Sequence, residues 1–136
     1  MFYKFRKNKK AFTLVELIVV IAIIAILGTV VGVSVTGFVN NAKKRTVDTA
    51  ADSVLTTWNL FVADGNTSEK WGVYLTNNMD NIGTVNITYD GSGVTANTTA
   101  TQAFSATGTI VVKDKNNKYT AKVNISNGKP SVTHVS

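Results

Sequence analysis

The first part of the chain is dominated by a long run of uncharged, mostly apolar residues. After Glu16 no charged residue occurs until Lys43, so Leu17–Ala42 contains 26 uncharged residues, most of them Ile, Val, Ala and Leu. A helix needs about 20 apolar residues to cross a bilayer. We therefore predict a membrane-spanning helix over residues 12–39, with apolar side chains on all of its faces.

The pattern becomes one-sided over residues 40–64. Apolar residues recur at steps of four and three, which is typical of a helix that packs one face on a sheet. This stripe consists of Val47, Ala51, Val54, Trp58 and Phe61, with Leu55 and Val62 beside it. A single helix from Phe12 to Asp64 would be about 80 Å long at 1.5 Å per residue. Half of such a helix must pack on lipid or on copies of itself.

The remaining residues, 66–136, show the alternation and turn signals of short strands. We predict strands over Thr84–Tyr89, Ala106–Lys113, Lys118–Ser126 and Ser131–Val135. Trp71–Thr76 fits either a strand or a connecting loop, and Thr95–Thr101 is expected to be an exposed loop or a weak strand. The expected fold class is α+β, with a small antiparallel sheet wrapped on the outer half of a long helix.

The formal net charge of +6 is unevenly distributed along the chain. Five of the 14 basic residues precede Ala11, namely Lys4, Arg6, Lys7, Lys9 and Lys10. The other nine stand against eight acids, so a basic nucleic-acid-binding body is not indicated. The basic head is typical of a cytoplasmic terminus, although three basic residues at 43–45 flank the far end of the apolar run.

Motifs of catalysis and metal binding are missing from the sequence. It contains no phosphate loop, no paired-histidine metal motif and no nucleophile elbow. The single histidine, His134, is expected to be a surface residue. Because there is no cysteine, disulfides, thiolate metal sites and a cysteine nucleophile are excluded. We therefore expect neither an enzyme nor a bound cofactor.

An acid near the start of the apolar run, Glu16, is unusual, because an acid at membrane depth costs roughly 3 kcal/mol or more and normally has a partner. It belongs to the stretch AFTLVELIVVIAIIAIL. Over Lys9–Leu27 this stretch resembles the class III signal sequence of type IV pilins and pilin-like proteins. The resemblance does not cover most of the chain. The absence of a carboxyl-terminal cysteine pair favours a Gram-positive member of this family.

The resemblance implies a processing site and an assembly contact. A membrane prepilin peptidase would recognise a motif that includes Thr13 and Leu14, cleave between Ala11 and Phe12, and leave a Phe12 amine that becomes methylated. Most members have Gly at the position of Ala11. In a bundle of staggered helices, Glu16 of one subunit would pair with the Phe12 amine of a neighbour and set the register. Alternatively, Glu16 lies in the headgroup layer without a role.

Small residues give the apolar run a possible packing face. Gly28 and Gly32 form a small-xxx-small pair, which allows two helix backbones to approach closely. Such residues are also common in membrane helices that make no such contact.

The predicted domain organisation is a cleaved basic leader over 1–11, a transmembrane and filament-core helix over 12–39, and a globular head over 40–136.

These observations together predict a type IV prepilin, the structural subunit of a surface fibre for adhesion or motility. Before assembly it would be a single-pass membrane protein with a cytoplasmic amino terminus, and afterwards part of an extracellular pilus. Its expected partners are the membrane, copies of itself, the peptidase, an assembly ATPase and a platform membrane protein, but not nucleic acid. The alternatives are a pseudopilin of a type II secretion or competence DNA-uptake machine, a minor pilin, and a simple membrane-anchored binding domain.

Overall fold

The structure is a computed structural model that describes residues 12–65 and 68–135, with only the backbone described at Val33. The predicted leader, residues 1–11, lies outside the described residues. The chain divides into two compact units, Met1–Phe38 and Val39–Ser136. The second unit is called the head below.

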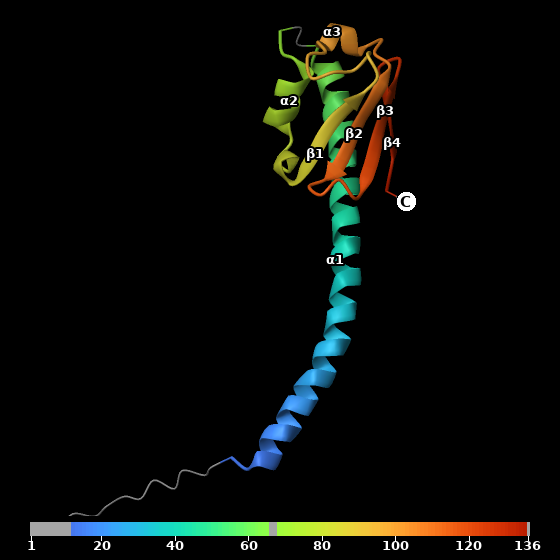
Figure 1. Cartoon of the computed structure of the whole chain (residues 1–136). Helices are drawn as coiled ribbons and strands as arrows, with labels where there is room; N and C mark the ends of the chain where they lie inside the picture. The colour runs from blue at the N-terminus through green and yellow to red at the C-terminus, as the bar shows by residue number, and fades with distance from the viewer. Residues whose placement is uncertain (1–11, 66–67, 136) are drawn as a thin grey trace, which may run out of the picture. The chain divides into compact units, whose positions relative to one another are not determined.

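The predicted long helix is confirmed as α1, which runs from Leu14 to Asp64 over 51 residues (Figure 1). Its end coincides with Gly65, which has a φ of 62°. Glycine adopts this left-handed conformation without steric strain, and it commonly stops a helix there. The apolar run and the one-sided stripe therefore belong to one continuous element, as the sequence predicted.

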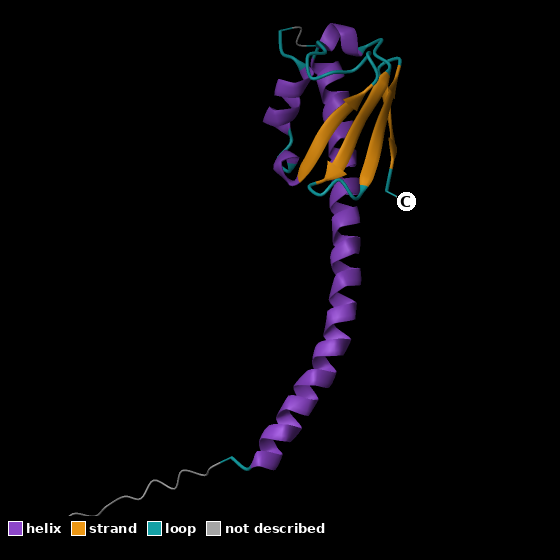
Figure 2. Cartoon of the chain, viewed as in Figure 1, coloured by secondary structure: helices purple, strands orange, loops and turns teal. Residues whose placement is uncertain are grey.

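The head contains a four-stranded antiparallel sheet in the order β1-β2-β3-β4 (Figure 2). Its strands are β1 (Val85–Asp90), β2 (Gly108–Asp114), β3 (Thr120–Ser126) and β4 (Lys129–Thr133). Each strand pairs with the next along the chain, and Val111 of β2 lies opposite both Thr88 and Lys122. The strands predicted over Ala106–Lys113 and Lys118–Ser126 are confirmed with small shifts of their ends. The last strand begins two residues before the predicted Ser131.

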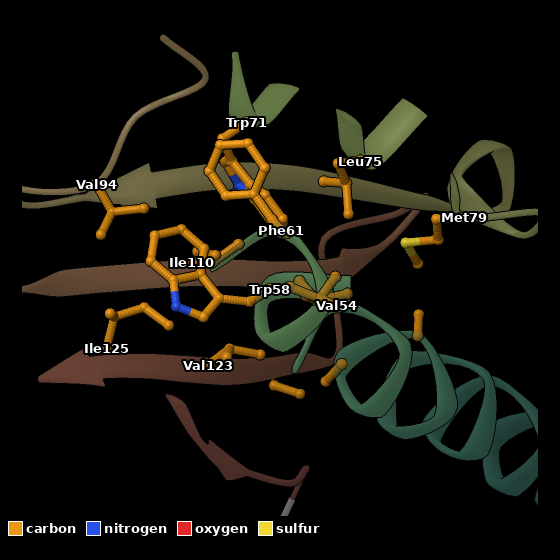
Figure 3. Packing of buried hydrophobic residues seen from close by; sticks show 14 of the residues in the cluster. Val54, Trp58, Phe61, Trp71, Leu75, Met79, Val94, Ile110, Val123 and Ile125 are labelled. Atoms are coloured by element: carbon orange, nitrogen blue, oxygen red, sulfur yellow. The ribbon is translucent and has the colours of Figure 1, made fainter. Parts of the chain in front are cut away.

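The core of the head forms where the stripe of α1 meets the inner face of the sheet. Val47, Ala51, Val54, Trp58 and Phe61 are all buried, as predicted. Figure 3 shows Trp58 beside Ile110 and Ile125, residues of the same hydrophobic cluster. The Trp58 indole Nε1 also donates a hydrogen bond to the Gly128 carbonyl oxygen at 2.9 Å. This side chain therefore joins α1 to the turn between β3 and β4.

The expectation that Trp71–Thr76 is a strand or a loop is wrong, because this segment belongs to the helix α2 (Trp71–Asn78). Trp71, Tyr74 and Leu75 are buried on one side of α2. Phe61 of α1 packs against two of them, with ring centroids 5.4 Å from Trp71 and 5.1 Å from Tyr74. The spacing of three and four residues is a helical signal, which the predicted strand-rich context had outweighed.

The expectation for Thr95–Thr101 is only partly correct: its first three residues, 95–97, form an exposed turn, whereas the rest of the run is neither an exposed loop nor a strand. Thr98 and Ala100 are buried, and Thr99 caps the short helix α3 (Ala100–Ala103) in a capping box with Gln102. The Thr98 carbonyl oxygen accepts a hydrogen bond from the Trp71 N–H at 2.8 Å. The run therefore holds the start of α2 in place. A short 3-10 helix, η1 (Ile82–Thr84), precedes β1.

Candidate functional site

Thr13 and Glu16 form a reciprocal pair at the start of α1. The Glu16 Oε2 atom accepts hydrogen bonds from the Thr13 backbone N–H at 2.9 Å and from its hydroxyl at 3.1 Å. In return, the Thr13 Oγ1 atom accepts one from the Glu16 N–H at 3.3 Å. This arrangement is a capping box, in which a Thr before the helix and a Glu three residues later satisfy each other's N–H groups. An acid in the first turn also interacts favourably with the helix dipole.

The capping box gives Glu16 a partner within its own chain. Sequence reasoning considered only a neighbouring subunit or the headgroup layer for this acid. The signal was nevertheless present, because Thr-x-x-Glu before an apolar run is the signature of a capping box. Both side chains are exposed in the single chain. The carboxylate is therefore held at the end of α1 while it stays accessible to another molecule.

The other predicted processing residues surround this pair. Phe12 precedes the box and is 85% exposed, and Leu14 is the first residue of α1 and is 74% exposed. Ala11, on the other side of the predicted scissile bond, lies outside the described residues. The described segment therefore presents Phe12, Thr13, Leu14 and Glu16 next to one another on an accessible helix start.

The apolar half of α1 is not covered by any other described residue. Every residue from 12 to 39 whose side chain is described is exposed. Within the described residues, α1 contains a segment long and apolar enough to cross a membrane. Soluble proteins rarely expose large contiguous apolar surfaces, and such surfaces mark contacts with protein or membrane. This half of α1 is therefore compatible with membrane anchoring.

Gly28 and Gly32 lie within this uncovered half. A Cβ atom added at either position would meet nothing within 4 Å, so neither glycine is required by packing inside the chain. The predicted helix-packing role of these two glycines would therefore require another molecule.

We expect Gly32→Leu to leave the level of membrane-inserted chain within about twofold of wild type, because Leu favours both helix and membrane. If the chain assembles into fibres in which two backbones approach at Gly32, fibre yield should fall at least about tenfold. Immunoblots of membrane and sheared fractions measure the two quantities. Val31→Leu, an exposed position on the same helix, is the matched control. Equal fibre yields for the two variants would remove the packing role.

A second polar contact, which the sequence did not reveal, ties the end of the described chain to α1. The His134 Nε2 and Asp52 Oδ1 atoms lie 2.9 Å apart, and the Val135 N–H donates to Asp48 Oδ1 at 2.7 Å. His134 is a surface residue, as predicted. Its hydrogen bond with Asp52 raises its pKa above the usual 6.5, and the charges of Asp52 and Asp48 raise it further.

We expect the stability of the head to depend on the protonation of His134. Because its pKa is raised on folding, the contribution is complete below about pH 6.5 and is lost as the pH rises through the folded pKa. His134→Asn should therefore lower the thermal midpoint at pH 5.5 by more than at pH 8.5, as measured by circular dichroism of the full chain in detergent. Asp52→Asn should remove the same pH dependence. A pH-independent difference would show that the ionised contact contributes nothing.

The described residues show no arrangement for metal chemistry. Within 12–65 and 68–135, no group of three His, Cys, Asp or Glu side chains is placed to hold a metal ion. A buried acid, Asp114, is used by its own turn: its carboxylate accepts hydrogen bonds from the N–H groups of Tyr119 at 2.7 Å and Asn116 at 3.3 Å. These bonds, the one from Tyr119 first, lower the pKa of Asp114.

One comparison with known proteins identifies the amino-terminal segment. A family model described as the prokaryotic N-terminal methylation motif matches residues 6–32, which include Phe12, the capping box and both glycines. No curated protein and no solved structure matches the chain. The matched residues confirm the resemblance found in the sequence, and the head has the expected antiparallel sheet on a long helix. The chain thus carries the class III signal of type IV pilin-like proteins, joined to a pilin-like α+β fold.

Proposed function

We propose that this chain is a prepilin, the structural subunit of a type IV pilus, which is cleaved after Ala11, methylated at Phe12 and assembled into a helical surface filament. The observation that carries the proposal is the uncovered apolar half of α1, which begins with the methylation motif. Two environments can cover such a surface on all sides, lipid and the same helix of other copies. A prepilin uses the first before assembly and the second afterwards.

Before assembly, residues 12–39 would span the membrane, with the basic leader in the cytoplasm and the head outside. The capping box supports this state, because unsatisfied polar groups in hydrocarbon each cost several kcal/mol. Thr13 and Glu16 satisfy each other's backbone N–H groups at the helix start. The charge of Glu16 remains, and it needs an opposite charge once it is surrounded by apolar helices.

During assembly, the apolar faces of neighbouring α1 helices would replace lipid around each subunit. Cleavage would create a positive amine on Phe12, four residues from Glu16. The carboxylate of one subunit could then meet the amine of the next, and a wrong stagger would leave both charges unpaired. This selection of register by a polar pair resembles the effect of a buried polar residue in a coiled coil. The peptidase, an assembly ATPase and a platform membrane protein are the partners that this pathway requires.

The proposal is tested by mechanically shearing cells that express the chain and imaging the released material by electron microscopy. We expect filaments in which this chain is the main component, and we expect the Ala11→Lys variant to be absent from them because its cleavage is blocked. A cleaved chain that stays in the membrane fraction would favour a pseudopilin or a minor pilin. A chain that is never cleaved would instead be a membrane-anchored binding domain.

A further inference from the structure

The head carries a cluster of basic residues at the end that adjoins the apolar run. Lys43, Lys44 and Arg45 follow the last uncharged residue of the run, Ala42, within one helical turn. The turn between β2 and β3 lies beside this part of α1 (Figure 1), and it contributes Lys115 and Lys118. These five residues are called the basic rim.

Contacts around one aromatic ring bring the two halves of the basic rim together. The Lys44 Nζ atom lies 5.8 Å from the centroid of the Tyr119 ring, and the Lys118 Nζ atom lies 5.2 Å from it. Ammonium groups within about 6 Å of a ring centroid are attracted to its π face. Residues more than 70 positions apart in sequence are thereby held at one level of the head.

Two of the acids near the basic rim, Asp114 and Asp48, form hydrogen bonds within the protein. The carboxylate of Asp114 accepts hydrogen bonds from the N–H groups of its own turn, and the charge of Lys43 contributes to its lowered pKa. The carboxylate of Asp48 accepts a hydrogen bond from the Val135 N–H. The loop before β1 brings a third acid, the exposed Asp80, toward this end, because Val85 at the start of β1 pairs with Asp114. Five basic residues against three acids still leave this end of the head positive. Lys115, Lys118 and Arg45 are exposed, while Lys43 and Lys44 are half-buried.

Membrane orientation does not explain this positive charge. The positive-inside rule places Lys and Arg on the cytoplasmic side, so a basic rim on the opposite side works against the orientation that the leader favours. A different role is therefore needed for charge at this position. Any membrane that covers residues 12–39 has its surface near residues 40–45, because a helix rises only 1.5 Å per residue. The basic rim would then lie at the level of the lipid headgroups.

We propose that the basic rim binds the phosphates of anionic lipid headgroups on the outer surface of the membrane that anchors α1. Near an anionic surface each Lys or Arg strengthens binding by about 1 kcal/mol, which is roughly fivefold. The contact would hold the head against the membrane before assembly, and withdrawal of the subunit into a fibre would break it. The inference rests on the proposed membrane-anchored state of the chain.

The test uses the full chain reconstituted into lipid vesicles. Because the sequence contains no cysteine, Asn116→Cys provides a single labelling site in the exposed β2–β3 turn. A fluorophore at this site reports contact with nitroxide-labelled headgroups through quenching. We expect quenching at least about threefold stronger with about 30% phosphatidylglycerol than with phosphatidylcholine alone, and loss of this difference in about 0.5 M salt.

Two double variants, each of which removes two positive charges, identify the residues responsible for contact with anionic headgroups. Introducing Lys115→Gln and Lys118→Gln together into the labelled chain should remove most of the extra quenching seen in anionic vesicles. Adding Lys122→Gln and Lys129→Gln, which alter exposed lysines of β3 and β4, should leave it unchanged. Equal effects of the two pairs would overturn the proposal, because only general charge would then matter.

Flotation of the vesicles separates this inference from the proposed function. If the chain floats with both kinds of vesicle but quenching does not depend on anionic lipid, the headgroup site is wrong while membrane anchoring stands. If the chain floats with neither, the membrane-anchored state fails and the headgroup site fails with it. Flotation with both, together with quenching that depends on Lys115 and Lys118, supports both.

Discussion

Replacing Glu16 with Val is expected to abolish fibre formation while leaving insertion and cleavage largely intact. The substitution removes an acid whose placement at membrane depth costs roughly 3 kcal/mol, so insertion of the chain into the membrane should not be reduced. It also removes the charge that would meet the Phe12 amine of a neighbouring subunit, which would then be buried without a partner. Removing one member of a buried charge pair costs about 3–5 kcal/mol. Immunoblots of sheared and membrane fractions measure the outcome.

The Glu16→Val experiment needs a control for the capping box, because the substitution also removes the acceptor of the hydrogen bonds from the Thr13 N–H and hydroxyl. Glu16→Gln provides it, since Gln also serves at this position of a capping box but has no charge. If assembly depends on the charge, Gln and Val should be equally defective. Normal fibres from the Gln variant would show that Glu16 acts through the helix cap and not through subunit pairing.

Trp58→Ala is expected to destabilise the head more than any other single truncation. The side chain is fully buried. The centroid of its ring lies 5.0 Å from the centroid of the Trp71 ring, and its indole N–H donates a hydrogen bond to the Gly128 carbonyl oxygen. Truncating a buried Trp costs about 3–5 kcal/mol, which for a domain of this size lowers the thermal midpoint by at least about 10 °C. Near-ultraviolet circular dichroism of the full chain in detergent measures the loss of tertiary packing.

Leu60→Ala is the matched control for that prediction, because Leu60 is 53% exposed on the same part of α1. Its effect should stay below about 1 kcal/mol, since little apolar surface is lost. Similar losses of stability for the two variants would mean that the Trp58 cluster is not the centre of the core.

Periodicity was sufficient to predict α1 and the sheet. The stripe from Val47 to Phe61 predicted which side of the helix would be buried, and all five of its residues are buried in the structure. Periodicity was misapplied at Trp71, Tyr74 and Leu75, where only two turns of helix are present among strands. Capping boxes at Thr13–Glu16 and Thr99–Gln102 were readable as Thr-x-x-Glu and Thr-x-x-Gln but were not used.

Long-range polar contacts could not be predicted, since they depend on the tertiary fold. Asp52 and His134 are 82 positions apart, and they meet only because the chain beyond β4 returns to α1. Lys44 and Lys118 likewise approach the same Tyr119 ring only after the sheet has packed on the helix. No local pattern in the sequence encodes either meeting. The assembly contact that we propose for Glu16 would involve a second chain, so neither the sequence nor the single chain can display it.

The most direct test of the central claim is an intact mass, with amino-terminal sequencing, of material sheared from the surface of expressing cells. The account predicts a dominant chain that begins at methylated Phe12, which would demonstrate cleavage after Ala11, methylation and assembly together. A surface chain that still begins at Met1 would contradict the account, because the methylation motif would then be present without being processed.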